Sequence, residues 1–421
     1  MVALLLILLF AFLIVGFPLF VGLIAAPLIV AVGYFPNLDI SMVAQQFYVG
    51  VSSQALMAVP MFILAADIMG AGQTAKRLLE LIDSLVGHFY GGLAITAEAT
   101  CTVFGALSGS AMATMVAIGK TMRPGLLQSG YKDNHIIGML VNASNIAFLI
   151  PPSVVMIMYC VVSGTSVASM FMAGIVPGVM IFAFFAIYDY IYARRHKIPR
   201  KPKATWKQRG HALKRGILTL GVPVLILGTI YTGFASPTEA AALSVLYALF
   251  LEIVIYRSFS VKDIPKIAYS TASVSATVFI LIAAGQVFSW VITYANLPAL
   301  LTDTIMGSQP SAMVILLVTS LFFFVACMFV DCVPVILILV PIIFPMAMAA
   351  GIDPVHLGII ATVQSCIGSV TPPFGANIFT ACVIFEKKFM EVVKGIWPYL
   401  IIFILFALLV VIFPQISLCL I

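Results

Sequence analysis

Two pairs of adjacent prolines lie inside long apolar segments of the sequence, at "IPPS" (150–153) and at "TPPF" (371–374). Each pair removes two helical hydrogen bonds and forces the preceding residue out of the helix, so we expect a broken helix at each place. An unwound turn at membrane depth leaves carbonyl oxygens free for a cation, and the half-helix that follows has an N-terminal dipole that favours an anion. A simple proline kink is the alternative at either place, but two related breaks favour a binding site.

Two further turns carry polar residues within apolar surroundings. "GALSGSA" (105–111) supplies glycines for a tight turn that exposes carbonyl groups, together with the hydroxyls of Ser108 and Ser110. "FVDCVP" (329–334) carries Asp331, and an Asp in hydrocarbon costs about 2.5–3.5 kcal/mol, so it needs a partner or a function. A cation ligand and a cap on the following half-helix would both suit this carboxylate.

We expect these turns and breaks to offer oxygen ligands to a hard monovalent cation such as Na⁺. The expected sodium-binding residues are Ser108, Gly109, Ser110, Asn145, Pro151, Asp331, Cys332, Thr371, Gly375 and Asn377. The expected substrate-binding residues are Ser110, Asn142, Ser153, Thr371 and Pro373. Any single Asn can equally serve as an interhelical hydrogen bond. Because no Lys or Arg lies within a predicted span, an anionic substrate would be held by half-helix N-termini, by the polar turns or through bound cations.

Enzyme chemistry finds no support in the sequence. The seven cysteines are scattered through apolar segments without paired spacing, and no transition-metal motif occurs. For "SGSA" (108–111) no His lies within a predicted span to act as its base. We therefore expect no catalytic residues and no cofactor. Glu98 is a candidate proton-coupling group, and a water-facing structural carboxylate is the alternative.

The composition indicates a membrane protein. Of the 421 residues, 63% are hydrophobic and 9% are charged, whereas a soluble protein has about 25% charged residues. Long apolar runs recur from Leu4 to Leu420, which predicts an all-α polytopic protein embedded in a lipid bilayer. The net charge of +6 is no argument for a nucleic-acid partner, because the positions of the charges matter more, and we expect none.

The Lys and Arg residues predict the topology. They gather at Lys76 and Arg77; at Lys120, Arg123 and Lys132; between Arg194 and Arg215; at Arg257, Lys262 and Lys266; and at Lys387, Lys388 and Lys394. The connections 33–41, 163–169, 233–239, 297–312 and 351–356 contain none. Under the positive-inside rule the first set faces the cytoplasm and the second set the outside.

Two segments enter and leave on the same face under this rule. Residues 92–119 have basic flanks on both sides, and residues 313–347 have them on neither side. Each is too short for two crossings of about 20 residues, so we expect re-entrant helical hairpins at about 92–119 and 313–341. One long tilted span in each place is the alternative, but the basic residues would then no longer all lie on the cytoplasmic face.

The N-terminal apolar run of residues 2–33 would form a helix of about 48 Å, against a hydrocarbon core of about 30 Å. We expect a break at "GFP" (16–18) that gives two short membrane spans. The first of them is expected to be a membrane span and not a signal peptide, because no basic n-region precedes it. Five crossings and a hairpin then precede the basic loop 194–215. With that loop in the cytoplasm, the N-terminus is expected outside.

The sequence repeats itself after this odd number of crossings. A shift of 221 residues superposes Pro124 on Pro345, Ser110 on Asp331 and Pro151-Pro152 on Pro372-Pro373. We therefore predict two inverted-topology repeats, residues 1–193 and 216–421, joined by the basic loop. Their broken helices are expected at about 134–163 and 356–384. Matched broken helices in inverted repeats are typical of secondary transporters.

The motifs "SGSAMATMVAIG" (108–119), "LIPPS" (149–153), "SPTEAAA" (236–242), "FVDCVPVILILVPIIFP" (329–345) and "TPPFGANIF" (371–379) occur in this order along the chain. Their combination resembles the large membrane subunit of tripartite ATP-independent periplasmic (TRAP) transporters over essentially the whole chain. One departure is "NASNIAFLIPPS" (142–153), where the family more often has small glycine-rich residues.

The resemblance implies a sodium-driven elevator in the bacterial inner membrane, with a scaffold and a transport domain built from the hairpins and broken helices. It also implies a small four-helix membrane subunit, a soluble periplasmic substrate-binding protein, and an organic-acid substrate such as a C4-dicarboxylate or a sialic acid. Three alternatives stay open: a proton-coupled transporter using Glu98 or Asp331, an ion channel, and an intramembrane enzyme.

Overall fold

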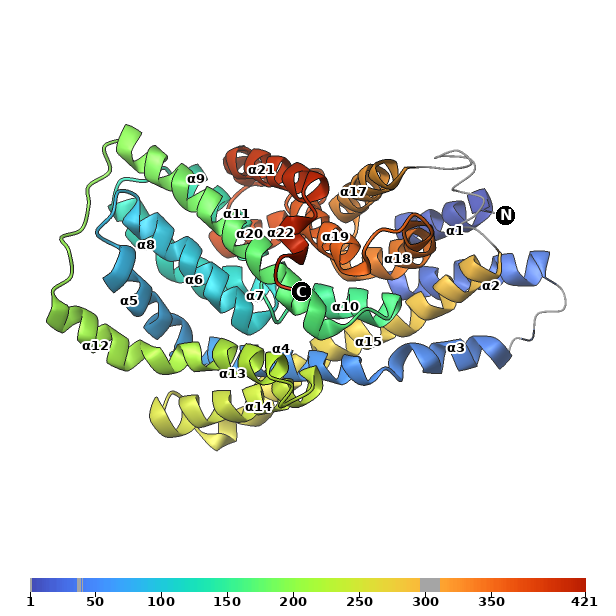
Figure 1. Cartoon of the computed structure of the whole chain (residues 1–421), viewed down its shortest axis with the longest axis horizontal. Coiled ribbons are helices and arrows are strands. Elements are labelled where there is room, and N and C mark those ends of the chain that lie inside the picture. The colour runs from blue at the N-terminus through green and yellow to red at the C-terminus, as the bar shows by residue number, and fades with distance from the viewer. Residues whose placement is uncertain (1, 36–38, 40, 296–310) are drawn as a thin grey trace.

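The computed structural model describes residues 2–35, 39, 41–295 and 311–421, and within these residues it contains helices and no strands (Figure 1). Eight helical segments among them are long and apolar enough to cross a membrane. The predicted all-α polytopic fold is therefore confirmed. Most of the predicted outer connection 297–312 lies outside the described residues.

The helices of the first half are α1 (Val2–Val15), α2 (Leu19–Tyr34), α3 (Ser41–Val51), α4 (Ala58–Ala71), α5 (Thr74–Val86), α6 (Gly92–Ser108), α7 (Ala111–Thr114), α8 (Lys120–Gln128), α9 (Asp133–Asn145), α10 (Val154–Ser163) and α11 (Val167–Arg195). Those of the second half are α12 (Trp206–Gly216), α13 (Gly221–Tyr231), α14 (Pro237–Leu249), α15 (Ile264–Tyr294), α17 (Ala312–Phe329), α18 (Cys332–Ala349), α19 (Pro354–Gly368), α20 (Ala376–Phe385), α21 (Phe389–Ile412) and α22 (Gln415–Leu418).

The predicted break in the N-terminal apolar run is present. Helix α1 ends at Val15, Gly16 adopts a positive φ of 91°, and α2 begins directly after Pro18. Only glycine adopts that backbone conformation without strain, and the proline then fixes the entry into α2. The N-terminus and α12, which follows the basic residues 194–203, lie at opposite ends of the long axis (Figure 1).

Helices α6 and α7 form a hairpin whose second arm continues through a π-helical turn (Met115–Gly119) into α8, nine residues beyond the predicted end at 119. Helices α17 and α18 form a second hairpin, which reaches Ala349, eight residues beyond the predicted end at 341. The first hairpin begins at the end of the molecule that carries α12, and the second begins at the end that carries the N-terminus (Figure 1). Both tips lie toward the middle.

The broken helices have corresponding boundaries in the two halves. Helix α9 ends at Asn145 and α10 begins at Val154, while α19 ends at Gly368 and α20 begins at Ala376. A shift of 221 residues carries the start of α9 at Asp133 onto Pro354, where α19 starts. The inverted relation of the halves remains the prediction made above, and these boundaries agree with it.

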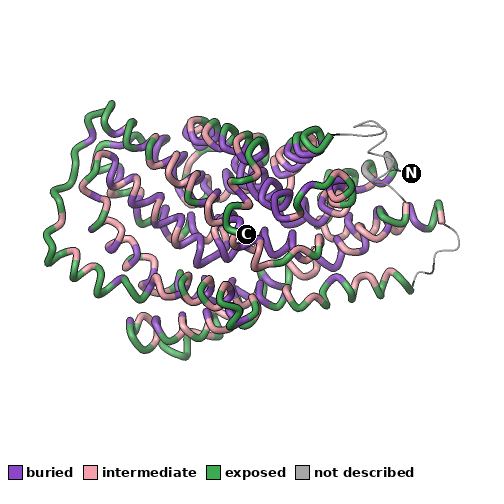
Figure 2. The backbone as a smooth tube through the Cα atoms, in the orientation of Figure 1, coloured by how far each residue is buried: buried purple, intermediate pink, exposed green. Residues whose placement is uncertain are grey.

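The two halves meet backbone to backbone where α9 crosses α21. A Cβ atom on Gly138 would overlap the carbonyl of Gly395, and a Cβ atom on Gly395 would overlap the carbonyl of Asn134. Glycine is thus required on both helices for this close approach. Buried residues concentrate in the central helices, whereas α12 and its neighbouring loop are exposed (Figure 2).

Helix α5 is amphipathic and is tied to α14 at its first residue. The buried carboxylate of Glu252, just beyond α14, accepts hydrogen bonds from the backbone amides of Gln73 (3.0 Å) and Thr74 (2.9 Å) and from the Thr74 hydroxyl (2.6 Å). These donors belong to a helix N-terminus, whose dipole favours a negative charge. The connection from α4 to the first hairpin is therefore fixed at this point.

Candidate functional site

The tip of the first hairpin is a two-residue turn, Gly109 and Ser110, against the first helix break. Gly109 adopts a positive φ of 58°, and a Cβ atom there would lie 2.9 Å from the carbonyl oxygen of Pro152. Ser110 caps α7 by accepting from the amide of Ala113 at 3.4 Å. The Ser108 hydroxyl lies 2.9 Å from that of Thr114. The tip thus presents oxygen atoms beside the proline turn.

The tip of the second hairpin has the corresponding place beside the second break. Asp331 caps α18 and accepts from the amide of Val333 at 3.3 Å. The thiol of Cys332 donates to the carbonyl of Ser365 on α19 at 3.4 Å. The rings of Phe329 and Phe374 are 5.8 Å apart, which joins the tip to the "TPPF" segment.

The two breaks are joined directly by side chains. Oδ1 of Asn145, the last residue of α9, accepts from the hydroxyl of Ser369 at 3.1 Å and from the amide group of Asn377. The backbone carbonyl of Asn145 also accepts from the thiol of Cys366 at 3.4 Å. All four residues are buried. One amide of the first half therefore holds both sides of the break in the second half.

A cavity of about 310 Å³ lies between both tips, both breaks and the helices α4 and α15. The lining residues include first-turn residues of four helices, α7, α10, α18 and α20. Four helix N-termini therefore meet at the cavity. Its polar side chains belong to Asp67, Ser108, Ser110, Asp331, Cys332, Ser369 and Asn377, and no Lys or Arg is among its described lining residues. Helix N-termini favour anionic groups, whereas the carboxylates favour cationic ones, so the cavity suits a ligand of mixed charge.

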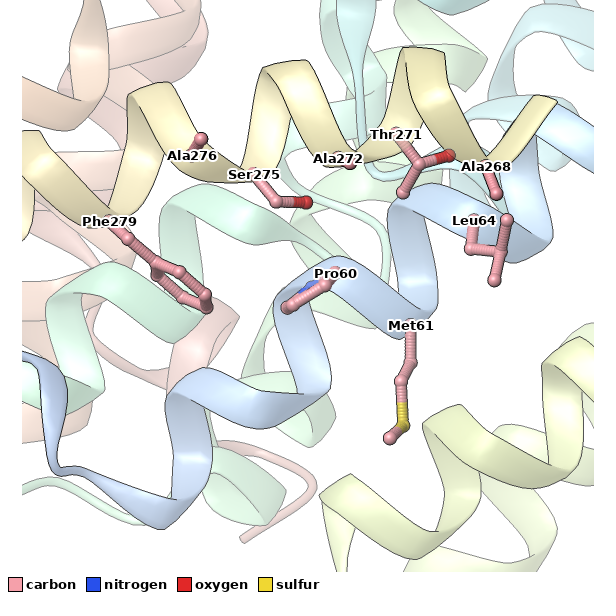
Figure 3. A pocket seen from close by; sticks show the side chains of 9 residues that line it. All are labelled: Pro60, Met61, Leu64, Ala268, Thr271, Ala272, Ser275, Ala276 and Phe279. Atoms are coloured by element: carbon pink, nitrogen blue, oxygen red, sulfur yellow. The ribbon is translucent and has the colours of Figure 1, made fainter. Parts of the chain in front are cut away.

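Asp67 on α4 is a functional candidate that the sequence reasoning missed. Its carboxylate faces the cavity and accepts from the Thr271 hydroxyl on α15 at 2.7 Å. Thr271 also lines a separate, open groove of about 420 Å³ between α4 and α15 (Figure 3). An ionisable residue in the apolar run "FILAADIMG" (62–70) was the signal available, since such residues are rare in spans and usually functional.

The cavity brings together six of the predicted site residues: Ser108, Gly109, Ser110, Asp331, Cys332 and Asn377. Asn145 lies one hydrogen bond behind it, through Asn377. Ser153 is buried and caps α10. Pro151, Thr371, Pro373 and Gly375 belong to the breaks and do not line the cavity, and the Thr371 hydroxyl donates to the carbonyl of Ile367 at 2.6 Å.

Asn142 and Glu98 also lie away from the cavity. The Asn142 amide donates within its own helix to the carbonyl of Gly138 at 2.8 Å. Glu98 is fully buried in α6, so it is not the water-facing carboxylate considered as an alternative. Sequence position alone could not separate Asn142 from Asn145, which are both buried on α9.

Comparison with known proteins gives a consistent result. Residues 6–416 match the family described as the DctM component of tripartite ATP-independent periplasmic transporters. The chain is 47% identical over 407 residues, 96% of its length, to the ectoine/5-hydroxyectoine TRAP transporter large permease protein UehC of Ruegeria pomeroyi, covering 95% of that protein. The ectoine permease TeaC of Halomonas elongata is equally similar over the same shares. The C4-dicarboxylate permease DctM of Rhodobacter capsulatus is 34% identical over 398 residues, covering 91% of this chain and 90% of that protein.

A similar fold is found in a solved structure, that of the YdaH transporter of Alcanivorax borkumensis. The likeness has a TM-score of 0.62 at 15% sequence identity and covers 89% of both chains. All of the permeases named above are transport proteins, which confirms the prediction that the chain is not an enzyme.

Proposed function

Because the chain belongs to the DctM family of tripartite ATP-independent periplasmic transporters, as a large permease subunit, we propose that it drives uptake of a carboxylate-bearing solute with sodium as the coupling ion. The observation that carries this proposal is the cavity at which four helix N-termini, two carboxylates and several hydroxyl and amide oxygens meet, with no basic side chain among its described lining residues. Oxygen donors of this kind suit Na⁺. A bound sodium ion would offset the carboxylate charge while the helix N-termini hold the substrate's carboxylate.

The proposal has a test that needs no substrate. The thermal midpoint of the purified protein is expected to be higher in NaCl than in KCl at equal ionic strength. A ligand that binds only the folded state stabilises it by about 2.7 kcal/mol at a concentration of 100 Kd. Asn145→Ala should reduce this sodium-specific difference, because Asn145 joins the two breaks.

Asn142→Ala is the matched control for that measurement. Asn142 is equally buried on the same helix, but its amide donates to Gly138 and not to the second break. The sodium-specific difference should therefore survive in this variant. Equal midpoints of the wild type in both salts would contradict a sodium site of useful affinity and would favour proton coupling.

We further propose an ectoine-like zwitterion as the substrate. Two relatives with 47% identity are named as ectoine permeases, and ectoine combines a carboxylate with a cationic amidinium group. Asp67 would face the cationic group, while helix N-termini would face the carboxylate. A charge-assisted hydrogen bond of this kind contributes about 1.5–3 kcal/mol.

Asp67→Asn is expected to raise the KM for ectoine uptake by the complete transporter about tenfold or more. The variant keeps an oxygen for the Thr271 hydroxyl and loses only the charge. Its sodium-specific thermal shift should be unchanged, and Thr271→Val, which keeps the carboxylate, should alter the KM much less. An unchanged KM in Asp67→Asn would refute the role of Asp67.

The remaining parts of the proposal follow the family. A small membrane subunit and a soluble periplasmic binding protein would complete the transporter in the bacterial inner membrane. The N-terminus would be periplasmic and the loop 194–215 cytoplasmic. The hairpins, broken helices, α11 and α21 would move as the transport domain against a scaffold that includes α4 and α15, the two helices that close the cavity from the other side.

A further inference from the structure

A second group of buried polar side chains lies outside the cavity, among four helices that we assign to the transport domain. Glu98 comes from α6, His135 from α9, Asp189 from α11 and Tyr399 from α21. Glu98, Asp189 and Tyr399 are 0% exposed, and His135 is 8% exposed. None of them lines the candidate cavity.

Asp189 is the centre of this group. Its Oδ1 atom accepts from Nε2 of His135 at 2.6 Å and from the hydroxyl of Tyr399 at 2.7 Å. The His135 ring is stacked on Tyr192, with centroids 3.6 Å apart, so its orientation is fixed. One oxygen of Asp189 is therefore fully partnered.

The other carboxylate oxygens lack donors. Within the described residues, no hydrogen-bond donor reaches Oδ2 of Asp189 or either oxygen of Glu98. Glu98 on α6 and Asp189 on α11 are nevertheless neighbours, because these two helices pack against each other. Two ionised carboxylates in such contact would repel each other, and a buried carboxylate without partners is strongly disfavoured. A single hydrogen atom between them removes both problems, because Glu98 then donates and Oδ2 of Asp189 accepts.

We propose that Glu98 and Asp189 form a proton-binding site, in which one proton is held between their carboxyl groups at neutral pH. The ionisable groups that face the pair are Cys101 on α6, Tyr131 before α9, His135 on α9, Tyr188 and Tyr192 on α11, and Tyr399 on α21. None of these groups is a Lys or Arg, and His135, which can carry a positive charge, meets Oδ1 of Asp189 and leaves the Glu98 oxygens without a partner. The bound proton joins α6, the first arm of the hairpin, to α11.

This site is independent of the proposed sodium site. Glu98 precedes the hairpin tip at Ser108 by nearly three helical turns, since ten residues separate them. A proton held there can stabilise the hairpin whether or not sodium binds at the tip. Loss of the sodium effect would therefore leave this inference standing, and the reverse is also true.

The first measurement is infrared spectroscopy of the purified full-length wild type at neutral pH. A carbonyl band of a protonated carboxylic acid is expected, with a shift in D₂O, and the band should vanish in Glu98→Gln. Glu80→Gln, whose carboxylate is 38% exposed and paired with Arg215, should leave the band unchanged. Absence of the band from the wild type would overturn the proposal even if Glu98→Gln failed to fold.

The second measurement is thermal stability against pH. A proton bound by the folded protein and not by the unfolded chain makes stability fall as pH rises, by tenfold in the unfolding equilibrium per pH unit. The amide of Glu98→Gln can still donate to Asp189, but it cannot bind or release a proton. The stability of this variant should therefore fall less steeply as pH rises, by the factor of ten per pH unit that one bound proton contributes. Identical slopes in the wild type and Glu98→Gln would contradict the proposed site.

Discussion

Asp331→Asn is expected to fold normally and to lose sodium-dependent uptake by about thirtyfold or more. Asn caps helices as well as Asp does, so the hydrogen bond to the amide of Val333 persists. The variant loses the only carboxylate at either described hairpin tip, and interactions of charged groups are worth about 1.5–3 kcal/mol each. Uptake by the complete transporter and the midpoint difference between NaCl and KCl would measure the loss.

Two variants separate the charge from the cap. Asp331→Ala removes both and should cost about 1 kcal/mol of stability in addition. Ser110→Ala removes a neutral hydroxyl at the corresponding place in the first hairpin, so its effect on uptake should be several times smaller. Unimpaired sodium dependence in Asp331→Asn would leave capping as the role of this carboxylate.

Gly395→Leu is expected to prevent stable folding, with a loss of more than about 3 kcal/mol. Its side chain would have to occupy the space of the Asn134 carbonyl and the backbone of Gly138. Overpacking against flexible side chains costs about 1–3 kcal/mol, and a backbone cannot yield as they do. The yield of monodisperse protein in detergent and its thermal midpoint would report the effect.

Gly228→Leu provides the matched control for this substitution. Gly228 lies in the interior of α13, its φ is not positive, and no atom lies within 4 Å of a Cβ built there. The same change of residue should therefore alter the midpoint little. A normal midpoint for Gly395→Leu would show that α9 and α21 can separate without loss of the fold.

The sequence predicts the local elements of this fold because their causes are local. Proline pairs break a helix wherever they stand, and Gly16 with Pro18 divides the N-terminal run for the same reason. The first hairpin was predicted to end too early because the charge pattern marks a membrane boundary, whereas the helix continues past Lys120 and Arg123 to Gln128. Charges locate the edge of the bilayer and not the end of a helix.

The parts that the sequence did not reveal depend on long-range packing. The contact of Asn145 with Asn377 joins residues 232 positions apart, and Asn142, three residues earlier, makes no such contact. Asp67 enters the cavity only because α4 and α15 pack together beside the hairpin tips. Helical periodicity shows which residues share a face, but it does not show what that face meets.

The shared oxygen of Asn145 has a thermodynamic consequence. An amide oxygen has two lone pairs, and here Ser369 and Asn377 take both of them. A cation that coordinates this oxygen must displace one of these donors, so ion entry is an exchange of a hydrogen bond for an ion contact. The released donor belongs to the other half of the chain, so cation binding at Asn145 would link binding events in the two halves. If one ligand changes the affinity of a second ligand by some factor, the second ligand changes the affinity of the first by the same factor.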